Sequence, residues 1–158
     1  MTDQKRIKVF LFAAIAAFVT MAVLLQIFIH PIAGFLPQSS ILGYEQSSFE
    51  KLGAGLTGHF ATIYLVTLGV IDLFFVLCFS LWLIFYFRRH NAFYYAVLLL
   101  AGIYTTEIIE NSRLLRELGV LGNGVVWNDA PPIVNFTRAK FAFFGVAILS
   151  AIWFWKRT

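Results

Sequence analysis

Acidic and basic side chains interrupt three apolar segments of this chain. Asp72 lies near the middle of one segment, Glu107 and Glu110 lie in the next, and Arg138 and Lys140 lie in the last. A charged residue at the centre of a membrane-spanning helix costs about 2.5–3.5 kcal/mol on insertion scales. Charged residues in such segments are therefore candidates for binding a ligand, an ion or a proton.

The spacing places these side chains at one depth. Asp72, Glu107 and Lys140 each lie about 15 residues from one end of their apolar segment, which is about 22 Å at the helical rise of about 1.5 Å per residue. Gln26 lies about 17 residues along the first apolar segment, at a similar height. Because the hydrocarbon layer is about 30 Å thick, the sequence predicts a polar layer in one leaflet.

Helical periodicity predicts which of these residues point the same way. One face of the third segment carries Tyr104, Glu107, Glu110 and Asn111, which follow the helical spacing of three and four residues. Asp72 is expected to face the other helices, with Gly69 allowing one of them to approach closely.

The two basic residues of the last segment must point in different directions. Arg138 shares a face with Gly145, a small residue suited to helix contact, so we expect Arg138 to pair with Glu107 or Glu110. Lys140 shares its face with three phenylalanines, so we expect it to face lipid and extend to the headgroups.

These considerations define a candidate binding site in the polar layer. Its residues are Gln26, Asp72, Tyr104, Glu107, Glu110, Asn111 and Arg138. Three inward acids then face one inward arginine, so either a carboxyl is protonated, water enters from outside to solvate the acids, or a cationic ligand or ion supplies the missing charge. A structural ion pair between helices and a contact with another subunit remain alternative interpretations of the same residues.

The amino-acid composition indicates which class of protein contains this polar layer. The 158 residues are 60% hydrophobic and 13% charged, against about 45–50% and about 25% in soluble domains. A soluble domain of this size could not bury so much apolar surface, so we expect an integral membrane protein. The net charge of +4 comes mostly from basic residues that flank apolar segments, which argues against nucleic-acid binding.

Four apolar segments are long enough to span a bilayer. We expect helices at about 8–30, 59–87, 92–118 and 132–155, which form one transmembrane domain over residues 1–158. A turn of only a few residues after Arg89 makes the second and third helices antiparallel neighbours. Basic residues gather at both termini and at this turn, so the prediction is an antiparallel four-helix bundle with both termini cytoplasmic, in a bacterial inner (plasma) membrane.

Other chemistries find little support in the sequence. The lone Cys78 cannot form an internal disulfide. A haem held between His30 and His59 is disfavoured because both histidines lie near the water boundary. We expect no cofactor and no bound metal, and a di-iron site would require Glu-x-x-His pairs that no segment carries.

Three functional hypotheses remain. The first is a membrane protein that binds or transports a lipid, an amphipathic molecule or a cation in the polar layer. The second is a non-catalytic accessory subunit or assembly factor of a larger membrane complex, in which the polar layer holds helices together. The third is an intramembrane isomerase-like enzyme that uses a carboxyl group as an acid. Membrane lipids are expected partners in each case, and homo-oligomers are compatible with all three.

Overall fold

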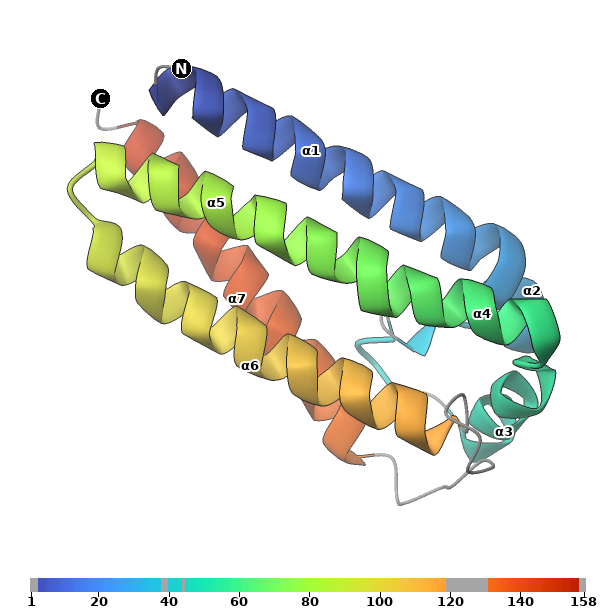
Figure 1. Ribbon diagram of the computed structural model, residues 1–158. Helices are drawn as coiled ribbons and strands as arrows, with labels where there is room; N and C mark the ends of the chain where they lie inside the picture. Colours follow the sequence, from blue (N-terminus) through green and yellow to red (C-terminus); the bar gives the residue numbers. More distant parts are fainter. Residues whose placement is uncertain (1–2, 38–39, 44, 119–130, 157–158) are drawn as a thin grey trace.

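The computed structural model describes residues 3–37, 40–43, 45–118 and 131–156, and every regular element in them is helical. In chain order these are α1 (Asp3–Leu24), the π-helical segment η1 (Leu25–Ile29), α2 (His30–Ala33), α3 (Gln46–Gly55), α4 (Gly58–Val66), the π-helical segment η3 (Thr67–Asp72), α5 (Leu73–Arg89), α6 (Phe93–Glu117) and α7 (Pro131–Trp155). Figure 1 shows their arrangement.

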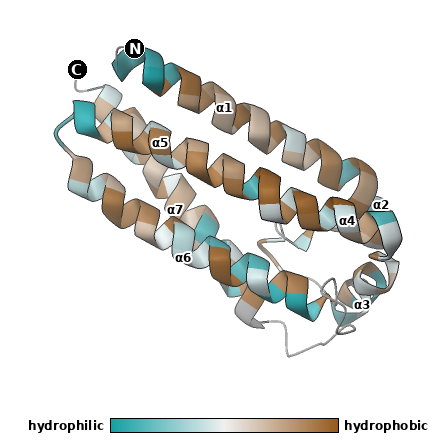
Figure 2. Ribbon diagram, in the orientation of Figure 1, coloured by the Kyte–Doolittle hydropathy of each residue, from teal (hydrophilic) through white to brown (hydrophobic). Residues whose placement is uncertain are grey.

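Four stretches of helix are long and apolar enough to cross a membrane: Asp3–Ile32, Gly58–Arg89, Phe93–Glu117 and Ile133–Trp155. The prediction of an all-helical fold with four helices long and apolar enough to span a membrane is therefore confirmed. Apolar residues dominate these stretches, and hydrophilic ones gather toward the helix ends (Figure 2). Residues 119–130, between the third and fourth of these stretches, lie outside the described residues.

The four stretches pack mainly in two pairs. Helix α1 packs along α5, and α6 packs along α7. The turn between α5 and α6 joins the pairs, with Asn91 at a positive φ of 56° and the Ala92 amide donating to the Phe87 carbonyl. The first turn of α1 and the last turn of α7 lie at the same end of the molecule as this turn (Figure 1).

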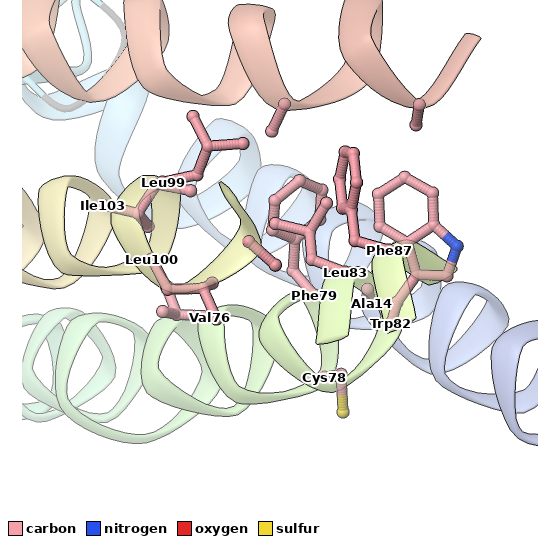
Figure 3. Close-up of a cluster of buried hydrophobic side chains, with 13 residues drawn as sticks. Ala14, Val76, Cys78, Phe79, Trp82, Leu83, Phe87, Leu99, Leu100 and Ile103 are labelled. Atoms are coloured by element: carbon pink, nitrogen blue, oxygen red, sulfur yellow. The ribbon is translucent and has the colours of Figure 1, made fainter. Parts of the chain in front are cut away.

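A large hydrophobic core fills the half of the bundle near the α5–α6 turn, and we call it the turn-side core. It comprises Ala14, Val76, Cys78, Phe79, Trp82, Leu83, Phe87, Ala96, Leu99, Leu100, Ile103, Ala147 and Ala151. Phe79 and Phe87 of α5 point toward α7 (Figure 3), where they meet Phe144 and Phe154. The Tyr86 hydroxyl donates to the Ala151 carbonyl at 2.6 Å, which ties α5 to α7.

A second core lies at the opposite end, and we call it the α3-side core. It comprises Leu25, Ile29, Phe49, Leu52, Leu56, Tyr64, Leu68, Leu114, Leu118 and Ile133. The short helix α3 contributes two fully buried side chains, Phe49 and Leu52. Helices far apart in the sequence therefore meet at this end through α3.

Two π-helical segments interrupt the first two membrane-spanning stretches. Segment η3 packs against α1, while η1 contacts α4. Asp72 is the last residue of η3 and is buried. Segments of π-helix are rare and are often found at functional sites, because the extra residue per turn moves side chains to a different face.

The rotation of α7 differs from the expectation. A β-carbon added to Gly145 or to the exposed Gly69 would meet nothing within 4 Å, so no close helix contact depends on either glycine. The close contact is made instead at Gly102 of α6, where an added β-carbon would lie 2.5 Å from the Phe143 ring. The phenylalanine-bearing face of α7 thus packs against α6 rather than facing lipid.

Candidate functional site

A buried polar network lies between the two cores and joins η3, α6 and α7. We call it the acid–lysine cluster, and it comprises Asp72, Glu107, Glu110, Asn111, Thr137 and Lys140. The exposed fractions are 3% for Asp72, 1% for Glu107 and 0% for Glu110. The sequence correctly predicted that these three acids share a depth and point inward.

Lys140 is the cation of this cluster. Its Nζ lies 3.3 Å from Oε1 of Glu107 and forms a second ion pair with Glu110. Only 6% of the residue is exposed, so the expectation that Lys140 faces lipid is wrong. An ammonium held by two carboxylates in this position neutralises charge that would otherwise be expensive to bury.

Arg138 does not pair with Glu107 or Glu110, which corrects the sequence prediction. Arg138 is exposed, and its Nε donates to the carbonyl oxygen of Ile41 at 2.8 Å. Residues two apart on a helix are rotated by about 200° about the helix axis and so lie on nearly opposite faces. Only one of Arg138 and Lys140 can therefore face the acids. The rotation of α7 that brings Phe143 to Gly102 turns Lys140 inward.

Asn111 links two of the acids. Its Nδ2 donates to Oδ2 of Asp72 at 2.9 Å and to Oε1 of Glu107 at 3.0 Å. One amide group therefore uses both of its hydrogens to hold a carboxyl of η3 next to a carboxyl of α6. The predicted shared face of Glu107, Glu110 and Asn111 is present.

Thr137 belongs to the cluster although the sequence analysis did not include it. Its hydroxyl donates to Oε1 of Glu110, and the residue is fully buried. Thr137 lies three residues before Lys140, on the same helical face. A correct assignment of Lys140 as inward-facing would have identified Thr137 as well.

Two other predicted site residues lie apart from the cluster. Gln26 is exposed on η1. Tyr104 is half-buried and packs against the turn-side core, and among the described residues no hydrogen bond joins it to the acids. The site is therefore narrower than expected, because it involves η3, α6 and α7 but not η1.

The histidines considered for haem lie near the α3-side end. His59 is exposed and its ring lies 4.0 Å from that of Phe60, while His30 begins α2 and is half-buried. Within the described ranges, no group of three or more His, Cys, Asp or Glu residues is placed to hold a metal ion.

The cluster contains more acid than base. Three carboxyl groups lie beside one ammonium, and two acceptor atoms, Oε2 of Glu107 and Oδ1 of Asn111, are buried with no donor among the described residues. Burying acceptors without donors is costly, as is burying carboxylates without cations. The arrangement can therefore take up positive charge together with hydrogen-bond donors.

A surface groove lies away from these residues, near the α5–α6 turn. Tyr95, Leu149, Ser150, Trp153 and Phe154 line it. Its polar groups, the Tyr95 hydroxyl and the Ser150 hydroxyl, are 2.8 Å apart and hydrogen-bonded to each other. This groove carries none of the charged chemistry of the acid–lysine cluster.

Comparison of the chain with protein-family models, with curated proteins and with solved structures finds no match.

Proposed function

We propose that this chain is a membrane protein that binds a small cationic molecule in the acid–lysine cluster and either holds or transports it. The observation that carries the proposal is the imbalance of buried charge, with Asp72, Glu107 and Glu110 beside the single ammonium of Lys140. Intramembrane acids usually belong to ion, proton or ligand pathways, because their burial is expensive.

The chemistry of the cluster favours a cation over the lipid or amphipathic ligands that the sequence also allows. Glu107 and Glu110 already bind one ammonium group, that of Lys140. The free acceptors on Glu107 and Asn111 would suit a second donor-bearing cation. A primary ammonium ion has the charge and the N–H donors that these acceptors lack.

The proposal includes the orientation predicted from the sequence. The chain would form one antiparallel four-helix domain in a bacterial inner membrane, with both termini cytoplasmic. The basic residues Arg88 and Arg89 end α5 on the side where α1 begins and α7 ends (Figure 1), which agrees with the positive-inside rule. The acid–lysine cluster would then lie toward the outer leaflet.

We expect Glu107→Gln to leave the protein folded and to remove cation binding. The substitution keeps the shape of the side chain but removes a negative charge that the cation requires. The measurement is the melting temperature of purified protein in nanodiscs, titrated with methylammonium chloride against sodium chloride at equal ionic strength. Bound ligand stabilises by about 2.7 kcal/mol at 100 times its Kd, so the wild-type melting temperature should rise with methylammonium and that of Glu107→Gln should not.

Glu117→Gln is the matched control. Glu117 is a buried acid on the same helix, with 3% exposed, but it lies outside the cluster. This variant should keep the methylammonium response. A wild-type protein with no specific response to methylammonium, together with a loss of folded yield in Glu107→Gln, would instead assign the cluster to helix packing.

A further inference from the structure

The acid–lysine cluster lies between two apolar layers. On one side, the residues one helical turn from Asp72, Glu110 and Thr137 are Leu68, Leu114 and Ile133, and all three belong to the α3-side core. On the other side, Val76 and Ile103 lie one turn from Asp72 and Glu107 and belong to the turn-side core. A polar solute must therefore pass one of these layers to reach the acids.

The two apolar layers differ in the helices that form them. The turn-side core is built from α1, α5, α6 and α7, which are long helices that pack along one another. The α3-side core is completed by Phe49 and Leu52 of α3, a helix of 10 residues that lies across the end of the bundle (Figure 1). Displacing α3 would remove Phe49 and Leu52 from the α3-side core without separating any of the four long helices from one another.

Helix α3 has the features of a movable element. Its buried side bears Phe49, Leu52 and the adjoining Leu56, whereas Gln46, Glu50 and Lys51 are exposed. Glycines with positive φ flank the helix, Gly43 at 101° and Gly58 at 53°, and a β-carbon added to Gly58 would meet nothing within 4 Å. Glycine readily changes conformation at such positions, which suits a hinge.

We propose that α3 is a hinged lid that controls access to the acid–lysine cluster from this end of the bundle. When the lid is closed, Phe49 and Leu52 complete the α3-side core and the acids are shielded from water. When it swings away, the α3-side core loses Phe49 and Leu52 and the acids become reachable. The inference rests on the proposed function for what the lid admits, but the motion of the lid can be tested without a ligand.

A disulfide can lock the lid. Gly55 at the end of α3 packs on Ile32 of α2, and a β-carbon built on Gly55 lies 3.5 Å from the Ile32 β-carbon. Disulfides have β-carbon separations of about 3.5–4.5 Å. The double variant Ile32→Cys/Gly55→Cys, in a Cys78→Ala background, should therefore form a bond when oxidised and release it when reduced.

The test measures how fast a water-soluble carbodiimide modifies the carboxyl groups of the cluster. Protein in nanodiscs is treated in the oxidised and the reduced state, and mass spectrometry follows the peptide that contains Glu107 and Glu110. We expect modification to be at least tenfold slower in the oxidised state. Glu50, which is exposed on α3, reports that the reagent is equally active in both states.

A second pair of variants covers the case in which the disulfide does not form. Leu52 and Leu83 are both fully buried, the first in the lid and the second in the turn-side core. Leu52→Ala should speed modification of the cluster several-fold, and Leu83→Ala should not. Equal rates in the locked and unlocked states, equal acceleration by both alanine variants, or no modification after Glu50 has reacted fully would each overturn the lid. Because no cation is added, these outcomes are independent of the methylammonium measurement.

Discussion

Replacing Lys140 by methionine is expected to lower the free energy of unfolding by about 3–5 kcal/mol, the usual result of removing one partner from a buried ion pair. Methionine keeps the length of the side chain and its packing but lacks the charge. Glu107 and Glu110 would lose the ammonium that contacts both of them. In thermal unfolding of the purified protein, this loss corresponds to a fall of about 10 °C.

Arg138→Met is the control for this prediction. Arg138 is exposed and its hydrogen bond goes to the backbone of Ile41, so we expect a change within about 0.5 kcal/mol. The sequence alone predicted the opposite, namely that loss of Arg138 would destabilise the protein more than loss of Lys140. Equal melting temperatures for the two methionine variants would contradict the inward position of Lys140.

A double variant separates the loss of charge from the loss of packing. Adding Glu110→Gln to Lys140→Met removes one of the carboxylates that had lost its partner. We therefore expect the double variant to be more stable than Lys140→Met alone. Contacting residues typically show coupling energies of about 0.5–3 kcal/mol in such cycles.

Gly102→Leu is expected to lower the free energy of unfolding by about 3 kcal/mol, at the upper end of the usual range for overpacking a core. A β-carbon at Gly102 would lie 2.5 Å from Cε1 and Cζ of Phe143. The stiff ring cannot fold away, so α6 and α7 would have to separate. The displacement would also disturb the ion pairs between Lys140 and the acids of α6.

The same substitution at Gly145 is the matched control. Gly145 lies in α7 with nothing within 4 Å of its built β-carbon. Leucine is a better helix former than glycine, so Gly145→Leu should leave the melting temperature unchanged or raise it slightly. If Gly102→Leu were tolerated as well as Gly145→Leu, the close contact of α6 and α7 at Phe143 would be wrong.

The sequence was sufficient to predict four helices long and apolar enough to span a membrane, because long apolar runs have few other stable locations. It was also sufficient to place Asp72, Glu107 and Glu110 at one depth, since helical rise converts spacing directly into height. However, the depth of a residue along a helix does not determine how that helix is rotated about its own axis. Gly145 suggested one rotation of α7, whereas the small residue that matters is Gly102 on the partner helix.

Other features had no clear signal in the sequence. Segments η1 and η3 lie within long apolar runs, so hydropathy alone does not distinguish π-helix from α-helix there. Helix α3 lies in a stretch rich in Gly, Ser and Pro that the sequence analysis did not assign to a helix. Phe49, Leu52 and Leu56 do follow helical spacing, but this local pattern does not reveal which core they join.

If the acid–lysine cluster binds a cation as proposed, the two apolar layers around it would also determine how that cation senses the membrane voltage. One elementary charge moved through 100 mV changes in energy by about 2.3 kcal/mol. Most of that potential falls across apolar material, so the layer of Leu68 and Leu114 carries one part of it and the turn-side core carries the rest. A cation that enters past α3 crosses only the first part. Under the proposed function, occupancy of the site would therefore be coupled to the membrane voltage, with less than one full charge of sensitivity.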